Sequence, residues 1–368
     1  LFENSGLIKI ATTAIGTGFS PGIYNRSTFT NYAGGEIRMD SIPRTGLHHQ
    51  SGTLTNGGKI ILGISFTVSS FSPGVYNEAT FVNQEDAELH IDRFQHVGFQ
   101  NAFNSSLTNA GLIRIGENVL GGNNGLYNDG TVNNQATGEI HVDNIPDANN
   151  RNGVFNGFNK TFTNAGKIFI GSAVGAGSTG LFNYGAFSNS GEVSVDHVRG
   201  ISNRHGMYHS SGTFTNTGKI ALGSVDSVGD WGIYSVATFN NNTGGESSID
   251  RCAITGLRNG SFGFGGTFTN AGKLNIGANA GVGNWGVWND SPFNNSGELT
   301  IDNTTVTALR NQSNAFTNTG SLALGGIANI GNWGLWNQAA FNNNAGGAIS
   351  IDRTSNTGLL NFANTFSN

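Results

Sequence analysis

The chain contains 368 residues with a formal net charge of −5, and only 11% of them are charged, well below the roughly one quarter that is usual in globular domains. It has 57 glycines and one cysteine, Cys252, so an internal disulfide is excluded, and no Cys/His spacing fits a zinc site. No basic block indicates a nucleic-acid partner, and no apolar run approaches the ~18 residues of a membrane span. We therefore expect no metal, no cofactor, no nucleic-acid partner and no membrane span.

A triplet recurs about every 26 residues along the whole chain. Its first residue is aromatic or aliphatic and its third is always Asn. The triplets begin at Phe2, Phe29, Leu54, Phe81, Leu107, Val132, Phe162, Phe187, Phe214, Phe239, Phe268, Phe293, Phe316, Phe341 and Phe366. A repeat of fixed period predicts a solenoid, in which each unit buries its apolar face against its neighbours.

The repeats are of two alternating kinds. The first, the Gly turn, reads T-F-T-N-x-G-K-I-x-I-G, as in Thr213 to Gly223, and continues after a Gly-rich loop with W-G-I-Y, as in Trp231 to Tyr234. The second, the Asp turn, reads F-N-N-x-x-G-E-I-x-I-D-R, as in Phe341 to Arg353, followed by G-L-x-N. Phe2 and Phe366 are separated by seven double repeats of about 52 residues, which predicts about 14 turns of about 26 residues.

Each turn contains short segments in which apolar residues alternate with polar ones. In Lys167 to Ile170 and in Leu299 to Ile301 every second residue is apolar, the period of a strand with one buried face. Three such segments per turn (F-x-N, I-x-I and G-I-x-N) predict an all-β fold, a parallel β-helix with three faces. With turns ~4.8 Å apart, we expect a rod of roughly 65 to 70 Å.

We expect residues 1–368 to form one continuous β-solenoid. Leu1 to Asn4 and Thr365 to Asn368 occupy the same phase of the repeat, and an open end of a solenoid exposes unpaired backbone groups unless a polar unit caps it. We interpret the chain as a segment of a longer repeat array or as a fibre subunit that stacks end to end.

Alternation places the first and third residues of each triplet on the same side, and the bulk of Phe makes that side the interior. The predicted Asn ladder consists of Asn4, Asn31, Asn56, Asn83, Asn109, Asn134, Asn164, Asn189, Asn216, Asn241, Asn270, Asn295, Asn318, Asn343 and Asn368. Stacked amides can bond from turn to turn, and an unpaired buried amide costs about 1 to 3 kcal/mol. A sugar-binding role for these Asn residues is the functional alternative.

A second column of Asn follows the G-[ILV]-x-N motif. It contains Asn25, Asn77, Asn101, Asn128, Asn156, Asn183, Asn259, Asn289, Asn311, Asn337 and Asn361, with His49, His209 and Ser235 as replacements. We expect this column to form a second ladder.

Charged residues also follow the alternation of the two turns. The I-x-I strand opens with Lys in four Gly turns (Lys59, Lys167, Lys219, Lys273) and with Glu in six Asp turns (Glu36, Glu88, Glu139, Glu192, Glu246, Glu298). Stacking then predicts a column of alternating Glu and Lys on the outer surface, in which each exposed contact contributes about 0.2 to 1 kcal/mol.

Asp closes the same strand in all seven Asp turns, at Asp40, Asp92, Asp143, Asp196, Asp250, Asp302 and Asp352. These carboxylates would lie two turns or roughly 9.6 Å apart, too far to share a calcium ion that needs ligands at about 2.3 to 2.6 Å. We predict that each Asp accepts backbone N–H groups at a corner.

An aromatic column is the candidate contact surface. In G-I-Y-N the aromatic residue alternates with inward neighbours, which predicts an outer file of Tyr24, Tyr76, Tyr127, Phe182, Tyr234, Trp288 and Trp336, one every second turn. Trp231, Trp285 and Trp333 are expected nearby in the preceding loop. Exposed aromatic rows mark ligand or lateral-contact surfaces; the alternative is that loops cover them.

The densest polar cluster comprises Asp196, His197, Arg199, Arg204, His205 and His209. A carbohydrate-cleaving β-helix would gather acids and bases in one such groove. Asp196 is, however, the repeat's own Asp. We therefore predict that the chain has no catalytic residues and is not an enzyme.

The phrases T-F-T-N-x-G-x-I-x-I-G and G-E-I-x-I-D-R recur along the whole chain. In them the chain resembles the tandem β-solenoid repeats of large secreted bacterial surface proteins, in the broad pectate-lyase-like or filamentous-haemagglutinin-like adhesin group. The resemblance implies an extracellular, cell-surface fibre or adhesin, a non-catalytic structural protein. Its implied partners are copies of itself, assembled head to tail or laterally, and surface glycans.

Two other classes of function stay open. A carbohydrate-binding or carbohydrate-active β-helix, either a lyase or a hydrolase, would need a groove with clustered polar groups. An ice-binding solenoid would need a flat Thr-x-Thr array, for which Gly turns supply the pairs Thr53/Thr55, Thr161/Thr163, Thr213/Thr215 and Thr267/Thr269. Most Asp turns have Asn in place of the second Thr, which interrupts such an array.

Overall fold

The computed structural model describes residues 1–11, 21–40, 45–63, 73–118, 121–146, 148, 150–199, 203–261, 265–362 and 365–368. These residues form two compact units, Leu1–Gly185 and Ala186–Asn368. Parallel β-strands are the regular secondary structure of both units. The predicted all-β parallel β-solenoid is therefore confirmed.

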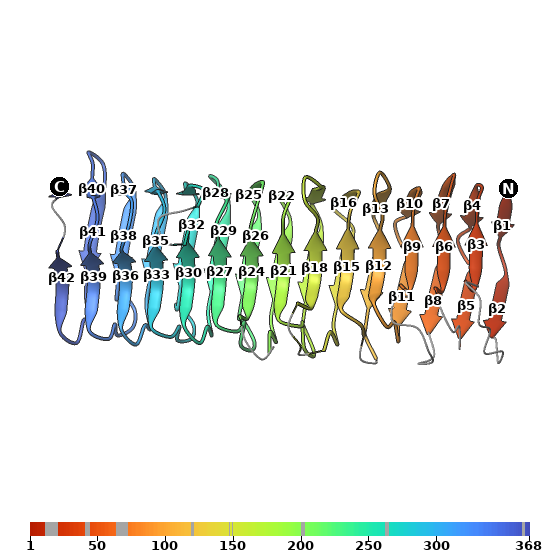
Figure 1. Ribbon diagram of the computed structural model, residues 1–368, viewed down its shortest axis with the longest axis horizontal. Helices are drawn as coiled ribbons and strands as arrows, with labels where there is room; N and C mark the ends of the chain where they lie inside the picture. The colour runs from red at the N-terminus through yellow and green to blue at the C-terminus, as the bar shows by residue number, and fades with distance from the viewer. Residues whose placement is uncertain are drawn as a thin grey trace. The chain divides into compact units, whose positions relative to one another are not determined.

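In each unit, equivalent strands of successive turns pair in parallel and form three sheets, as the stacked arrows of Figure 1 show. Sheet A contains the F-x-N triplets, sheet B the I-x-I segments and sheet C the G-I-x-N segments. Counted between successive strands of sheet A, the first unit contains six turns and the second seven. The chain therefore makes about 13 turns within its two units, close to the predicted 14.

The first unit has seven strands in each sheet. Sheet A contains β1 (Phe2–Asn4), β4 (Phe29–Asn31), β7 (Thr53–Asn56), β10 (Thr80–Asn83), β13 (Ser106–Asn109), β16 (Thr131–Asn134) and β19 (Thr161–Asn164). Sheet B contains β2 (Leu7–Ala11), β5 (Glu36–Asp40), β8 (Lys59–Gly63), β11 (Glu88–Asp92), β14 (Leu112–Ile115), β17 (Glu139–Val142) and β20 (Lys167–Ile170). Sheet C contains β3 (Ile23–Asn25), β6 (Leu47–His49), β9 (Val75–Asn77), β12 (Val97–Asn101), β15 (Asn124–Asn128), β18 (Asn152–Asn156) and β21 (Thr179–Asn183).

The second unit repeats the arrangement, with eight strands in sheet A and seven in each of the others. Sheet A contains β22 (Ala186–Asn189), β25 (Thr213–Asn216), β28 (Thr238–Asn241), β31 (Phe268–Asn270), β34 (Phe293–Asn295), β37 (Phe316–Asn318), β40 (Phe341–Asn343) and β43 (Phe366–Ser367). Sheet B contains β23 (Glu192–Val195), β26 (Lys219–Leu222), β29 (Glu246–Ile249), β32 (Lys273–Ile276), β35 (Glu298–Ile301), β38 (Ser321–Leu324) and β41 (Ala348–Ile351). Sheet C contains β24 (His205–His209), β27 (Trp231–Ser235), β30 (Thr255–Asn259), β33 (Trp285–Asn289), β36 (Thr307–Asn311), β39 (Trp333–Asn337) and β42 (Thr357–Asn361).

The core of the second unit contains a stack of Phe rings from sheet A. Phe214, Phe239 and Phe268 are buried and in register. Their ring centroids are 4.7 and 4.8 Å apart and the rings are nearly parallel. Because paired strands lie ~4.8 Å apart, identical side chains in register stack at the spacing of the strands. The predicted inward position of the triplet Phe is confirmed.

Sheet C approaches sheet B so closely that the first position of its G-I-x-N motif has room for only a very small residue. A Cβ on Gly153 would lie 2.2 Å from Ile170 Cγ2 and 2.8 Å from the carbonyl oxygen of Gly180. Ala308, which is buried at the equivalent position of β36, is the largest residue found there among the described turns.

The predicted Asn ladder forms in both units with a single direction. Each Asn Nδ2 donates to Oδ1 of the Asn in the next turn, at 2.7 to 2.8 Å from Asn4 to Asn164 and at 2.5 to 2.8 Å from Asn189 to Asn368. The amides also donate to backbone carbonyls at the corner, as from Asn31 to Gly35 at 3.2 Å. The ladder thus joins successive turns, and its amides also donate hydrogen bonds to the backbone carbonyls at the corner between sheets A and B.

The second ladder forms as well, but it is interrupted where Asn is replaced. Asn25 Nδ2 lies 2.8 Å from His49 Nδ1, but His49 Nε2 lies 3.1 Å from the carbonyl oxygen of Thr80, so the imidazole extends the ladder by one contact only. The shorter Ser235 donates instead to the carbonyl of Ala237 at 2.9 Å. In the next turn, Asn259 Oδ1 is buried with no hydrogen-bond partner among the described residues.

The Asp of the Asp turn binds the loop of the Gly turn that follows. Asp250 Oδ1 accepts backbone N–H groups of Asn279 and Ala280 at 3.0 and 3.1 Å. The same contact to a loop N–H is made by Asp92, Asp143, Asp196 and Asp302. The predicted corner role is therefore confirmed for these five of the seven repeated Asp residues.

Steric contact at the same corner requires the alternation of Asp and Gly. Gly223 has a φ of 70°, and a Cβ on it would lie 2.0 Å from the carbonyl oxygen of Asp250 in the next turn. Only glycine adopts such a φ at no steric cost. Arg251, which follows Asp250, donates in return to the Gly223 carbonyl at 2.6 Å. Each Asp turn therefore fits against a Gly turn.

We predict that Phe268→Ala lowers the free energy of unfolding by about 3 to 5 kcal/mol, because the ring is buried between Phe239 and Phe293. Thr269→Ala, at the neighbouring outward position of β31, should be nearly neutral. Denaturant unfolding of both variants checks this, and equal losses would show that the triplet side chains do not differ in burial.

We predict that Asn270→Leu destabilises the second unit by about 1 to 3 kcal/mol, because it removes the donor to Asn295 Oδ1 and the acceptor of Asn241 Nδ2. Asn294→Leu, exposed on β34, is the matched control and should have little effect. Hydrogen exchange at the corners of β28 and β34 measures the change locally. Unchanged protection in the Asn270 variant would mean that the ladder contributes nothing to stability.

Candidate binding surface

The outward face of sheet C in the second unit presents one side chain per turn in a continuous column. We call it the aromatic–arginine file; its members are Tyr208, Tyr234, Arg258, Trp288, Arg310 and Trp336. All six are half-buried. Strand pairing in register stacks them directly on one another, because their side chains point away from the core at the same position of each strand.

Arginine side chains cover the ring faces within this file. Arg258 Cζ lies 5.2 Å from the ring centroid of Tyr234 and 4.7 Å from that of Trp288. Arg310 Cζ lies 4.6 Å from Trp288 and 4.9 Å from Trp336. Each cation–π contact is worth about 0.5 to 2 kcal/mol, depending on its exposure to water. Both faces of Trp288 are thereby occupied by guanidinium groups.

This stacking limits what the file can bind. A sugar ring that stacks on Trp288 would have to displace Arg258 or Arg310. Trp285 also packs edge-on against Trp288, with centroids 4.6 Å apart. The file therefore presents ring edges and guanidinium groups to a partner, rather than open aromatic faces.

The structure places Trp231, Trp285 and Trp333 as the first residues of β27, β33 and β39. The expectation that they lie in the preceding loop was wrong by a few residues, because each of them pairs in register with the Thr that opens the neighbouring strand. Trp333 contacts Trp336 at 4.8 Å, as Trp285 contacts Trp288.

In the first unit, Tyr24, Tyr76, Tyr127 and Phe182 occupy the outward position of β3, β9, β15 and β21. Tyr24 is exposed, and the other three are half-buried. Tyr127 stacks on Phe155 of the intervening Asp turn with centroids 4.7 Å apart. Whether these residues contact a ligand stays a prediction.

The column on sheet C has further members between those predicted from the sequence. They occupy the x position of G-L-x-N in the Asp turns: His48, Gln100, Phe155, Tyr208, Arg258, Arg310 and Leu360. The signal was present, because the motif is the same as in the Gly turns. Reading both kinds of turn together would have predicted a file with one member in every turn.

The two arginines of the file differ in their contact with a buried carboxylate. Arg258 Nη2 lies 3.4 Å from Asp290 Oδ2, and Asp290 is buried. Burial lowers the pKa of Arg310, and the nearby Arg258 lowers it further while Asp290 opposes this. Arginine nevertheless stays protonated in proteins, so both guanidinium groups of the file carry a positive charge.

The polar cluster that departs from the repeat is divided among separate contacts. Arg199 and His197 each pair with Asp226, and Arg204 pairs with Asp230. Asp196 accepts N–H groups of the next loop. His209 Nε2 lies 2.9 Å from the carbonyl oxygen of Thr238. His205 stacks between Tyr208 and Trp231, at 5.0 and 4.9 Å. Acids and bases of this cluster are thus not aimed at a common point.

The outward face of sheet B has the predicted alternation of charge. Lys59 pairs with Glu88 at 2.6 Å and Lys167 with Glu139 at 2.8 Å in the first unit. Lys219 pairs with Glu192 at 2.8 Å in the second. These side chains are partly exposed to solvent, so they fix register more than they add stability.

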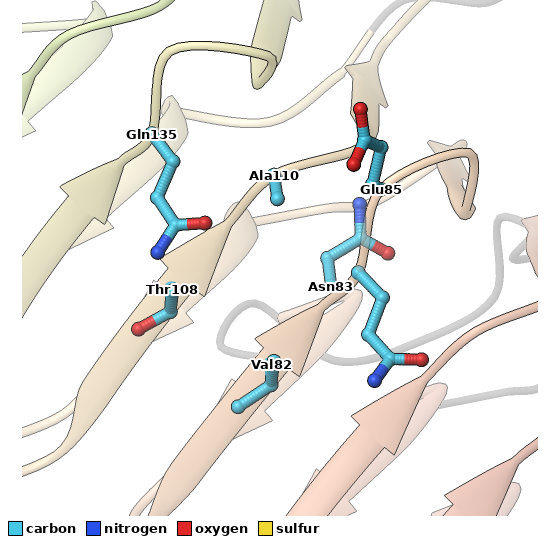
Figure 2. Close-up of a pocket in the computed structure, with 7 residues that line it drawn as sticks. Val82, Asn83, Glu85, Thr108, Ala110 and Gln135 are labelled. Carbon is cyan, nitrogen blue, oxygen red and sulfur yellow. The ribbon is translucent and has the colours of Figure 1, made fainter.

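A shallow depression lies beside the outward face of sheet A in the first unit. Its volume is about 490 Å³, and its lining includes Val82, Gln84, Glu85, Thr108, Ala110 and Gln135. Figure 2 shows Val82 and Thr108 on neighbouring strands, with the Gln135 side chain beside Thr108. Amide and hydroxyl groups in such a lining can donate to and accept from a neutral polar ligand.

Among the described residues, no three His, Cys, Asp or Glu side chains are grouped so as to hold a metal ion. In the same part of the chain, no helix is long and apolar enough to cross a bilayer.

Burial lowers the pKa of His205 to about 4, whereas an unfolded His titrates near 6.5. The unfolded chain therefore binds the proton more tightly, and this stabilising contribution is complete above pH ~6.5 and is lost as the pH falls toward ~4. It amounts to about 3 kcal/mol. We predict that His205→Gln flattens the dependence of unfolding free energy on pH between 6.5 and 4. An unchanged slope would contradict the buried neutral imidazole.

Comparison of the chain with protein-family models, curated proteins and solved structures gives no match. The classification therefore rests on the chain's own geometry. That geometry is a parallel β-solenoid whose alternating Asp and Gly turns are joined by Asn ladders.

Proposed function

We propose that the chain is a non-catalytic structural and adhesive component of an extracellular, cell-surface fibre. This proposal is supported by the hydrogen bonds that the repeated polar residues of the chain make with neighbouring turns. Asn residues bond to Asn residues of the next turn, and Asp residues bind the next loop. The polar groups that recur are therefore engaged in holding turns together.

The outward faces favour adhesion over catalysis. A solenoid repeats its outward side chains along each face, as in the alternating Glu and Lys of sheet B. A ligand with its own repeat can therefore make many equivalent contacts. Such contacts can be weak individually and still give an avidity ~10²-fold or more above a single site. An active site needs the opposite arrangement, with different groups converging on one bond.

The resemblance to secreted bacterial adhesin repeats supports the proposed location and partners. On this proposal the partners are other copies of the chain, which extend or align the fibre, and glycans on a surface. Fold alone does not fix function, so the proposal also depends on the character of the faces.

Carbohydrate binding is the second candidate, and the depression on the first unit favours it. Thr108 and Gln135 approach one another there, and Gln84 lines the same depression (Figure 2). A neutral sugar offers hydroxyl groups that match amides and hydroxyls in both donor and acceptor capacity.

The test is adhesion of beads that carry many copies of the full chain to surfaces coated with neutral or acidic polysaccharides. We predict retention that depends on multivalent display and falls in the double variant Gln84→Ala/Gln135→Ala. Gln338→Ala, an exposed position of the second unit, is the matched control and should be retained like the wild type. Release of soluble sugar products by the wild-type chain would contradict a non-catalytic role.

A further inference from the structure

The outward face of sheet A in the first unit has an unusual composition. Two residues per turn point outward from β4, β7, β10, β13, β16 and β19, one before and one after the buried core residue. We call the twelve positions the hydroxyl face: Thr28, Thr30, Thr53, Thr55, Thr80, Val82, Ser106, Thr108, Thr131, Asn133, Thr161 and Thr163. Nine are Thr and one is Ser, and none of the twelve is charged. The neighbouring strand β1, at the edge of the same face, presents Glu3 in register with Thr30.

Strand register arranges these side chains in two straight columns. Thr53, Thr80, Ser106, Thr131 and Thr161 are successive partners in one column. Members of a column are ~4.8 Å apart, and the two columns are separated by two residues of extended strand, about 6.6 Å. The face is therefore a two-dimensional lattice of hydroxyl and methyl groups.

The hydroxyl groups of this lattice are available to a ligand. Ser106 Oγ donates to Thr80 Oγ1 at 3.3 Å. Among the described residues, the hydroxyl groups of the other eight Thr side chains make no hydrogen bond within the protein. Thr is β-branched and stiff at χ1, so ordering these side chains against a lattice costs little additional entropy.

We propose that the hydroxyl face binds the surface of an ice crystal. A ligand that matches it must repeat in two directions at the spacing of a β-sheet, and water oxygens in ice repeat on this scale. The absence of charge on these twelve residues also favours ice as the ligand, because charged groups hold liquid water in hydration shells of their own. The methyl groups of Thr order the first layer of water over the face, and the hydroxyls anchor that layer.

The equivalent face of the second unit is less regular. Its outward positions include Ala186, Pro292, Asn294, Ala315 and Ala340. The Asn residues that interrupt the Thr array in Asp turns also lie mostly there, whereas the first unit has one, Asn133. The proposal is therefore restricted to the first unit. It does not rest on the proposed fibre function, but the hydroxyl face shares Val82 and Thr108 with the depression described above.

Thermal hysteresis and inhibition of ice recrystallisation by the full chain test this proposal. We expect both activities in the wild type and their loss in the double variant Thr55→Tyr/Thr108→Tyr, because bulky rings in the second column interrupt the lattice of hydroxyl and methyl groups. The matched control is Thr215→Tyr/Thr269→Tyr, at equivalent positions of the second unit, which should keep full activity. Unfolding midpoints close to that of the wild type establish that the variants are folded.

Three results would overturn the proposal. One is a wild-type chain without hysteresis or recrystallisation inhibition. Another is an equal loss in the variants of the two units, which would assign the effect to general surface properties. The third is binding to crystalline cellulose or chitin without any effect on ice, which would assign the lattice to a polysaccharide.

Discussion

The hydrogen bond between stacked Asn side chains is the interaction on which the rest of the structure depends. An amide has both a donor and an acceptor, so one Asn can accept from the preceding turn and donate to the following one, as Asn56 does between Asn31 and Asn83. Because the ladder is buried, a shift of register by one residue would leave amides without partners at a cost of about 1 to 3 kcal/mol each. The ladder thereby fixes the register in which Phe rings stack and Glu meets Lys.

Because the register is fixed, contacts between neighbouring turns determine that Asp turns alternate with Gly turns. Asp250 reaches forward to the loop after β32, while Gly223 lies so close to the Asp250 carbonyl that no side chain fits. One kind of turn supplies the carboxylate and the other supplies the space. Two successive Asp turns would lack that space, and two successive Gly turns would lack the acceptor for the loop. The double repeat of the sequence is the consequence.

Register also determines the character of the outer faces, because each outward position becomes a column. Sheet A presents neutral hydroxyl groups in the first unit, sheet B presents alternating charges, and sheet C presents rings and guanidinium groups. The three faces therefore offer different chemistry to a partner. On sheet A, stacking of the turns leaves Thr hydroxyl groups open to solvent. On sheet C, the same stacking covers the ring faces of Trp288 with guanidinium groups.

The sequence by itself determined the solenoid, its three strands per turn, the inward Phe and Asn, and the corner role of Asp. These features depend on the period of the chain and on the alternation of side chains along a strand, which are local properties. The tertiary structure decided what each outward residue meets in the next turn. Only strand pairing placed Arg310 between Trp288 and Trp336 and paired Arg199 with Asp226 instead of Asp196. It also left Asn259 Oδ1 without a hydrogen-bond donor, because Ser235 occupies the ladder position in the preceding turn. Such contacts join residues about 26 positions apart, and their geometry depends on side-chain length and direction, which the repeat pattern does not specify.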